Sequence, residues 1–363
     1  MNARAKTVDK SPVDEGTPYE TLLPLVGAIL TTGTSVLLRG HPGVGKSALA
    51  AELARRLDLP LVDIRLAQRD PADIGGVYFP DRERGVLDLY PPDWVRAACD
   101  APTFIFLDEL NAAVTRLHQS VAYQIVLEHR IGPFKFHPST VVLAAGNLEE
   151  DNAIVTSLSS ALCNRFAHFI LRVDAAGWVR WGNAAGVDPR ILAYIGFSGE
   201  PALYENSGEL AFPSPRSWEM ASRVLSVLHD EDAKRGVAAC VGPAEAEKLF
   251  SFLRIYGRVD VDAILKKGKE MDFTRGKDAD PSFIYAAVFA VASALCRPGR
   301  QVTAVELDHT VKFLRSPGLD PEYTMLFLKH LKARSNLLEA LRRLPEFRAL
   351  AGELVDLRRG LYS

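Results

Sequence analysis

The sequence predicts an α/β protein in which a parallel β-sheet precedes an all-helical region. In the first half of the chain, short apolar segments alternate with helical patterns, and each is long enough for one strand: Ser35–Leu38, Leu61–Ile64, Thr103–Leu107, Val141–Ala145 and Phe169–Val173. Their hydrophobicity is continuous rather than alternating, which is typical of strands that helices cover on both faces. The strand pattern ends near Asp174, and the rest consists of helical patterns separated by proline and glycine.

The first element is predicted to be a helix that begins at residues 17–20. Thr17 is a suitable N-cap, Pro18 suits the first helical position, and Glu20 stands where a capping box requires an acid. Apolar residues follow at helical spacing from Leu22 to Leu30. We therefore expect a capped helix ahead of the first strand.

Composition excludes several classes of protein. The 363 residues carry 43 Lys and Arg against 45 Asp and Glu, so bulk electrostatics would not hold this chain on nucleic acid or on a membrane. The four cysteines lie far apart and lack the spacing of a zinc site. The polar N-terminus has no signal sequence, and the longest uncharged apolar run, Phe283–Cys296, is shorter than the ~18 residues of a membrane span. We expect a cytoplasmic protein without a membrane span.

The most specific motif is the segment GHPGVGKS at residues 40–47, which matches the P-loop pattern G-x-x-x-x-G-K-[ST]. Glycines let backbone N–H groups surround phosphate oxygens, and the following helix directs its positive end at the anion. Lys46 would contact the β- and γ-phosphates of ATP, and Ser47 would bind Mg²⁺. The predicted nucleotide contacts are Gly40, His41, Pro42, Gly43, Val44, Gly45, Lys46, Ser47 and Ala48.

A second motif is the apolar strand Phe104–Leu107, which ends in Asp108 and Glu109. Ligands of open parallel sheets bind at the carboxyl ends of strands, so both carboxylates are expected beside the P-loop. Asp108 would hold Mg²⁺ through its water shell, and Glu109 would polarise the attacking water. The alternative is a helix N-terminus that carries acids, as many do.

Three further polar residues complete the candidate set. Asn147 ends the strand Val141–Ala145 and could orient water; the alternative is an ordinary turn asparagine. Arg165 lies at the end of a short predicted helix, and Arg216 follows Pro215 in the first turn of another. A guanidinium suits a phosphate under attack, although surface and ion-paired arginines are far more common.

In order and spacing these motifs resemble an AAA+ ATPase, and within that superfamily the MoxR branch. The segments that carry the resemblance are Ser35–Ser47, Asp63–Gln68, Asp73–Gly76, Phe106–Asn111, Ala144–Asn147, Ala161–Phe166 and Phe212–Trp218. The resemblance covers about residues 19–230. His41 is a departure, because proline is more common at that loop position.

The resemblance implies a role for each matching residue. Asn147 would be the sensor 1 residue, Arg165 the arginine finger that reaches a neighbouring subunit's nucleotide, and Arg216 the sensor 2 arginine of a helical lid. Together with the pattern of the residues, it predicts four parts: a flexible tail over residues 1–16, an AAA+ P-loop core over 17–173, the lid over 174–240 and a C-terminal helical segment over 241–363.

The resemblance further implies an assembly and a partner. MoxR-like ATPases form rings, usually hexamers, with a motor or chaperone-like activity on protein complexes. The branch carries an insert that Gly75–Trp94 would supply, and a second hairpin is expected around Glu128–Gly132; both could face the ring channel or be plain surface loops. Such ATPases are commonly paired with a von Willebrand factor A-domain protein, and this chain has no D-x-S-x-S metal motif of its own. Its helices after about Val241 are the candidate docking segment, unless their apolar stripes pack an internal core.

The sequence therefore predicts a Mg²⁺-dependent ATPase that remodels or activates a protein partner. One alternative is a nucleic-acid-dependent motor with a similar core, which the absence of a basic stripe disfavours. The other is a nucleotide-switched scaffold with little turnover, which the presence of Glu109 and Arg165 disfavours.

Overall fold

The computed structural model describes residues 16–111, 115–148, 158–297, 299–331 and 335–360. The chain divides into two compact units, with the boundary between Asp174 and Ala175. The tail expected over residues 1–16 lies outside the described residues, apart from Gly16.

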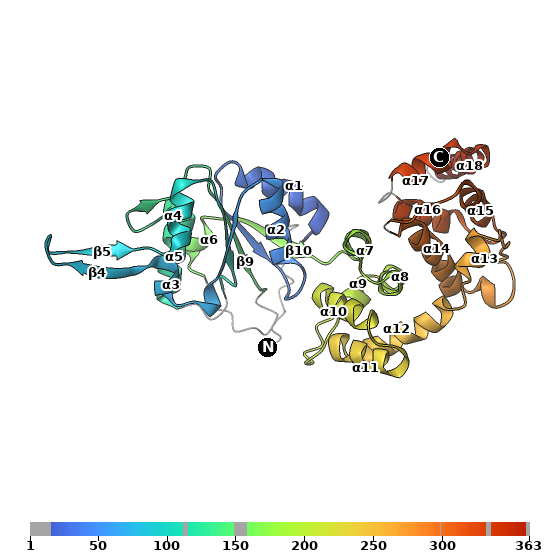
Figure 1. Ribbon diagram of the computed structural model, residues 1–363, viewed down its shortest axis with the longest axis horizontal. Coiled ribbons are helices and arrows are strands. Elements are labelled where there is room, and N and C mark those ends of the chain that lie inside the picture. The colour runs from blue at the N-terminus through green and yellow to red at the C-terminus, as the bar shows by residue number, and fades with distance from the viewer. Residues whose placement is uncertain (1–15, 112–114, 149–157, 298, 332–334, 361–363) are drawn as a thin grey trace, which may run out of the picture. The chain divides into compact units, whose positions relative to one another are not determined.

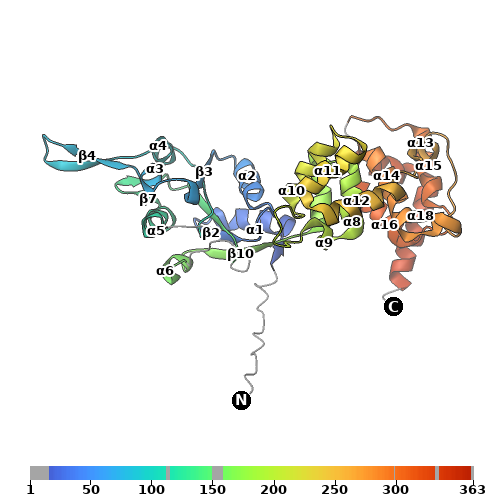
Figure 2. The ribbon, with the colours of Figure 1, turned by 90° about the horizontal axis from the view of Figure 1, so that it is seen from below.

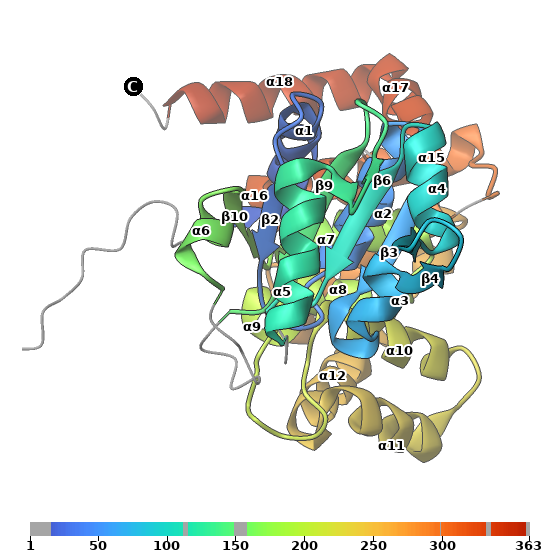
Figure 3. The same ribbon diagram turned by 90° about the vertical axis from the view of Figure 1, so that its left-hand side faces the viewer.

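The first unit contains a six-stranded sheet in the order β1-β10-β2-β9-β6-β3, with all neighbours parallel. The five strands predicted from the sequence are all present, and the α/β fold class is confirmed. Figure 3 shows these strands side by side with a helix in front of them. The strands are β1 (Thr17–Pro18), β2 (Val36–Arg39), β3 (Leu61–Arg65), β6 (Phe104–Asp108), β9 (Val141–Gly146) and β10 (Ala167–Arg172).

Helices bury the sheet on both faces, as continuous strand hydrophobicity requires. Leu37 packs in a core with residues of α3 (Pro71–Gly75), α4 (Asp93–Asp100) and α5 (Arg116–Tyr123). Its neighbours Val36 and Leu38 point the opposite way and are also fully buried. Helices α1 (Tyr19–Leu30) and α2 (Lys46–Arg56) contact β9.

The capping box expected at the start of the chain is wrong. Thr17 and Pro18 instead form β1, which pairs with Leu171 and Arg172 of β10. Helix α1 begins at Tyr19, and Pro18 at its N-cap makes no side-chain capping bond. Pro18 has extended backbone angles, which suit a strand edge, so sheet pairing takes the residues that local propensity assigned to a helix.

Two antiparallel hairpins interrupt the α/β pattern. The insertion expected at Gly75–Trp94 contains β4 (Val77–Asp81) and β5 (Val86–Tyr90), which extend away from the sheet (Figure 1). The second, β7 (Arg130–Ile131) and β8 (Phe134–Lys135), follows a π-helical turn, η2 (Gln124–Glu128), and lies close to where a hairpin was expected.

The second unit is helical, and its described residues contain no strand (Figure 2). Helix α14 is buried along most of its length at the centre of a large hydrophobic core. None of the helices within the described ranges is long and apolar enough to cross a membrane. The helices are α7 (Ala175–Ala185), α8 (Pro189–Ser198), α9 (Glu200–Leu203), α10 (Pro215–Leu225), α11 (Asp230–Val241), α12 (Pro243–Tyr256), α13 (Val261–Leu265), α14 (Pro281–Cys296), α15 (Ala304–Leu314), α16 (Pro321–Leu331), α17 (Ser335–Arg343) and α18 (Pro345–Gly360).

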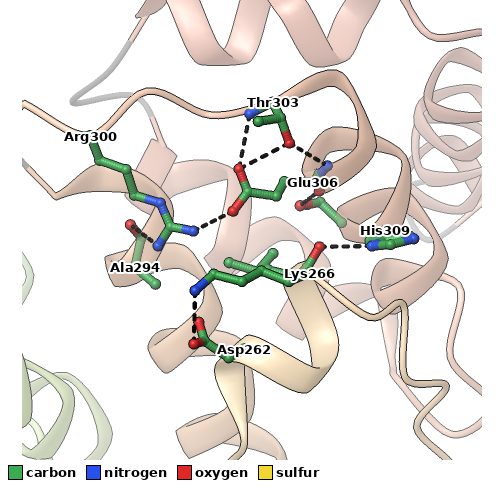
Figure 4. Close-up of polar contacts among 9 residues, drawn as sticks. Asp262, Lys266, Ala294, Arg300, Thr303, Glu306 and His309 are labelled. Carbon is green, nitrogen blue, oxygen red and sulfur yellow. Dashed lines mark hydrogen bonds and ion pairs between the residues drawn. The ribbon is translucent and has the colours of Figure 1, made fainter.

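A polar network fixes the start of α15 in this unit (Figure 4). Thr303 and Glu306 form a reciprocal capping box, and Arg300 donates to Glu306 Oε1 at 2.5 Å. Burial alone would raise the pKa of Glu306, but the bonds from Thr303 and Arg300 outweigh burial and lower it. The network thus holds a buried acid in its charged form at a helix N-terminus, where that charge is favourable.

Candidate nucleotide-binding site

The P-loop begins where β2 ends, between β10 and β9 in the middle of the sheet. Gly45 closes the loop as the N-cap of α2 with a φ of 105°, a conformation that side chains rarely tolerate. Helix α2 then starts at Lys46. The first backbone N–H groups of a helix have no intrahelical partner, so the loop and helix together present donors to an anion.

Lys46 is buried to 8% exposure, and oxygen atoms surround its ammonium group. Its Nζ donates to Gly40 O at 2.6 Å, to His41 O at 3.0 Å and to Asn147 Oδ1 at 2.9 Å. A buried ammonium needs such partners, and phosphate oxygens are acceptors of the same kind. The P-loop lysine and the predicted sensor asparagine are thus in direct contact.

Asp108 lies at the end of β6, opposite the start of α2. Ser47 Oγ donates to Asp108 Oδ2 at 3.1 Å, and Glu109 N donates to Asp108 Oδ1 at 2.9 Å. Asp108 belongs to the strand, and α5 begins only at Arg116, so the alternative of acids decorating a helix N-terminus does not describe it. Glu109 has a φ of 58°, the left-handed region that is costly for a side chain.

The paired hydroxyl and carboxylate of Ser47 and Asp108 fit a magnesium ion. Both offer hard oxygen donors, and Mg²⁺ is usually held by one or two protein groups together with water and substrate phosphates. No cluster of three or more His, Cys, Asp or Glu side chains suited to a metal occurs in the described part of the chain. Any magnesium at this site would therefore depend on water and the nucleotide for the rest of its coordination.

Asn111 is a polar residue of the site to which the sequence motifs assigned no role. Its side chain is 7% exposed; Nδ2 donates to Asn147 O at 2.8 Å, and Oδ1 accepts from Asn147 N at 3.0 Å. The pairing spans two strands that are distant in sequence and adjacent in the sheet. The sequence signal was an asparagine two positions after Glu109, but only strand order reveals its partner.

Both candidate arginines have exposed side chains. Arg165 is exposed in the turn after α6 (Ser160–Cys163), and its guanidinium makes no hydrogen bond or ion pair with the described residues. That turn is held by His168, whose Nε2 lies 2.7 Å from Cys163 O. Arg216 is exposed in the first turn of α10, which belongs to the second unit. The structure thus brings together Lys46, Ser47, Asp108, Glu109 and Asn147 of the predicted set.

Two cavities lie in the second unit, and charged residues in each form hydrogen bonds with one another. One of 840 Å³ lies beside the Arg300–Glu306 pair. The other, of 440 Å³, contains Glu245, which is 4% exposed and bonded to Tyr194 Oη at 2.5 Å and Lys248 Nζ at 2.9 Å. Burial is the main cause that raises the pKa of Tyr194. The candidate chemistry therefore lies at the P-loop.

A P-loop set between parallel strands, with an acid pair at the end of a nearby strand, defines a P-loop nucleotide-binding protein. Residues 36–172 match the model of the family described as "ATPase family associated with various cellular activities (AAA)". This segment is therefore an AAA ATPase domain, a family whose members bind nucleotide.

Individual proteins are similar to this chain over different lengths. CD-NTase-associated protein 6 of Pseudomonas aeruginosa is 33% identical over 113 residues, which are 30% of this chain and 35% of that protein, so the match spans about a third of the relative. Among solved structures, the RuvB Holliday junction branch migration motor of Thermotoga maritima is 16% identical, with a TM-score of 0.35 and coverage of 79% of this chain and 85% of that chain. NtrX from Brucella abortus is 11% identical, with a TM-score of 0.34 and coverage of 93% and 69%. Both TM-scores are below 0.5, so neither structure bears on function.

Proposed function

We propose that this protein is a MoxR-like AAA+ ATPase that hydrolyses ATP, with Mg²⁺, to remodel or activate a protein partner complex. The observation that carries the proposal is the contact of Lys46 with Asn147, beside the contact of Ser47 with Asp108, inside an AAA domain. Each of these side chains comes from the carboxyl end of a strand or from the helix that follows it. That edge of a parallel sheet is where ligands bind.

Binding of ATP is assigned to residues 40–48. The loop N–H groups and the α2 N-terminus would surround the phosphates, and the Lys46 ammonium would exchange acceptors of its present set for β- and γ-phosphate oxygens. Ser47 and Asp108 would hold Mg²⁺, which supplies positive charge against the phosphates when bound.

Hydrolysis is assigned to Glu109 and the residues around it. Glu109 would accept a proton from water as the water oxygen bonds to the γ-phosphorus, while the bond from that phosphorus to the β–γ bridging oxygen breaks and ADP leaves. Asn147 would orient the water, Arg165 of a neighbouring subunit would stabilise the charge that develops, and Arg216 would report the nucleotide state to the lid.

The proposed assembly is a homo-oligomeric ring, most simply a hexamer, in which the exposed Arg165 is available to the site of a neighbouring chain. We keep the proposed divisions of the chain: the core over 17–173, the lid over 174–240 and the C-terminal segment over 241–363. We also propose a cytoplasmic location, with no nucleic-acid partner.

The β4–β5 hairpin is the proposed contact with the protein client. Tyr78 and Leu87 on one face are 62% and 64% exposed, while Phe79 and Tyr90 pack edge to face at 5.2 Å on the other and are also more than half exposed. A two-stranded ribbon with apolar side chains on both faces is poorly stabilised alone and is typical of an interaction site.

A von Willebrand factor A-domain protein is the proposed partner, and the segment after Val241 its docking site. The apolar stripe of α12 is not the docking surface, because Leu249 and Phe252 are buried within the second unit. Docking would instead use the exposed faces of the later helices.

The test compares wild type with Glu109→Gln in the full-length chain. Wild type should release phosphate from ATP only when Mg²⁺ is present, and Glu109→Gln should bind ATP with little turnover and retain a protein partner in a pull-down. Phosphate release by Glu109→Gln at the wild-type rate would refute its assignment. Binding without turnover in wild type would favour a nucleotide-switched scaffold, and turnover that requires DNA or RNA would favour a nucleic-acid motor.

A further inference from the structure

Asn111 forms a two-way bridge between the acidic turn and the strand that carries the sensor asparagine. It uses both halves of its amide on one residue, the donor on Asn147 O and the acceptor on Asn147 N. The bond from Leu110 N to Ala145 O at 2.8 Å continues the pairing beyond the end of β6. Asn147 is therefore held by its backbone from the side of β6, while its own side chain extends to Lys46.

Gly146 shows how closely Asn111 approaches β9. A Cβ atom on Gly146 would lie 2.7 Å from Asn111 Oδ1 and 3.0 Å from Asn111 Cγ, and Cβ atoms do not come within 3.0 Å of other atoms. Glycine at this position leaves the room that the Asn111 amide occupies. The pair fixes the backbone orientation of the next residue, Asn147.

We propose that Asn111 is a positioning residue for hydrolysis: it holds Asn147 so that its amide oxygen stays on the Lys46 ammonium, and so links the Asp108–Glu109 turn to the P-loop. This inference rests on the proposed ATPase function. Only an amide supplies one donor and one acceptor in this geometry; an aspartate retains the acceptor, and an alanine retains neither.

The role predicts an effect on turnover rather than on ATP binding. Lys46 keeps two backbone acceptors, and the P-loop does not depend on Asn111, so ground-state contacts with phosphate survive its loss. Misplacement of a positioned group by about 1 Å can cost on the order of 100-fold in rate. We expect Asn111→Ala to lower kcat by at least about tenfold and to leave the Kd for ATP within about threefold.

The first experiment measures kcat and the ATP Kd for Asn111→Ala and Asn111→Asp in the full-length chain with Mg²⁺. Asn111→Asp should fall between wild type and Asn111→Ala, because it keeps the acceptor for Asn147 N. A kcat for Asn111→Ala within twofold of wild type per folded chain, or an equal loss in kcat and binding, would overturn the proposal.

A double-mutant cycle with Gly146→Ala adds a test that leaves the Asn111 side chain in place. The new methyl group should displace Asn111 and lower kcat as Asn111→Ala does. In the double variant the added methyl group meets no amide. The loss of kcat in the double variant should therefore not exceed the loss in Asn111→Ala alone. Losses that multiply would show that the two positions act separately, against the proposal.

A third measurement does not depend on hydrolysis. In the nucleotide-free protein, an amine-reactive label should modify Lys46 several-fold faster in Asn111→Ala and Gly146→Ala than in wild type, because Asn147 Oδ1 no longer holds its ammonium. The exposed Lys248 serves as the internal reference in mass spectrometry. Unchanged labelling of Lys46 would refute the positioning role, even if the chain proved to have no ATPase activity. Faster labelling without turnover would refute only the ATPase proposal.

Discussion

The start of α2 and the starts of α12 and α15 hold buried charges of opposite sign. Helices α12 and α15 carry Glu245 and Glu306 in or near their first turn, where the partial positive charge of a helix favours an anion. Helix α2 begins with the cation Lys46 and has no acid in its first turn. Its charge opposes the helix dipole, and three oxygen acceptors compensate for it.

The sign of the buried charge distinguishes a ligand site from a structural network more clearly than the degree of burial does. Lys46 and Glu245 are about equally buried and both have hydrogen-bond partners, yet only Lys46 has the charge that an incoming phosphate would complement. Glu109 also adopts a left-handed conformation beside α2, whereas Glu245 and Glu306 do not. We therefore expect substitutions near α2 to alter activity, and substitutions in the second unit's networks to alter stability.

The largest expected effect concerns Arg165. This arginine is exposed, whereas Arg300 of the second unit is ion-paired with Glu306. Arg165→Ala should reduce hydrolysis strongly, with the ~10³–10⁵ loss known for GTPase arginine fingers as an upper guide. Mixing Arg165→Ala with Lys46→Ala chains should restore part of the activity, because one supplies an intact site and the other an intact finger. Absence of rescue at every ratio, in rings shown to be mixed, would eliminate the role in a neighbouring site.

The fold was predictable because it depends on patterns within single segments. Five continuous apolar segments gave the five main strands, and the P-loop motif placed the start of α2 at Lys46. The start of α1 was not predictable in this way, because pairing with β10 draws Thr17 into the sheet. Local capping rules contain no information about that distant partner.

The candidate site was likewise predictable only as far as patterns within single segments reach. Motif spacing predicted Lys46, Ser47 and Asp108 as site residues, and the structure shows their contacts, while their roles stay predictions. The bonds between Asn111 and Asn147 depend on β6 and β9 lying side by side, and the left-handed conformation of Glu109 depends on the turn that follows β6. The roles of Arg165 and Arg216 stay predictions, since each would act on groups outside its own unit or chain.

The next effect compares Lys46→Ala with Glu245→Ala. Lys46→Ala should weaken ATP binding by about 100-fold or more while the free energy of unfolding without nucleotide changes by less than about 1 kcal/mol, because an unfavourable helix charge is removed along with its bonds. Glu245→Ala should lower that free energy by about 2 kcal/mol, because Tyr194 loses a hydrogen bond to a charged group. Calorimetric titration and denaturant unfolding distinguish the two variants. The reverse pattern would contradict the division into site and network.

A smaller effect should appear in the pH dependence of stability through His330, which packs on Phe289 with ring centres 4.6 Å apart. Burial lowers the pKa of His330 to about 4, below the ~6.5 of an unfolded histidine. The unfolded chain therefore binds this proton first as the pH falls below 6.5, and stability is lost progressively down to about 4. At pH 4.5 the loss of stability amounts to about 2.5 kcal/mol, and His330→Gln should abolish this loss. Parallel stability curves of wild type and variant would show that His330 does not contribute.

The smallest effect tests whether the strain at Glu109 belongs to function. A left-handed conformation costs a side chain about 1–2 kcal/mol, and glycine avoids that cost but loses about 0.5–1 kcal/mol in chain entropy. Glu109→Gly should therefore raise the free energy of unfolding by up to about 1.5 kcal/mol while it abolishes hydrolysis. Glu109→Gln is the matched control, because it loses the carboxylate but keeps the backbone strain, so its stability should equal that of wild type. Denaturant unfolding of the nucleotide-free chains provides the measurement. A Glu109→Gly chain less stable than Glu109→Gln would show that the surrounding turn does not strain this residue, and it would remove the second of the two features that set the α2 region apart from the networks at α12 and α15.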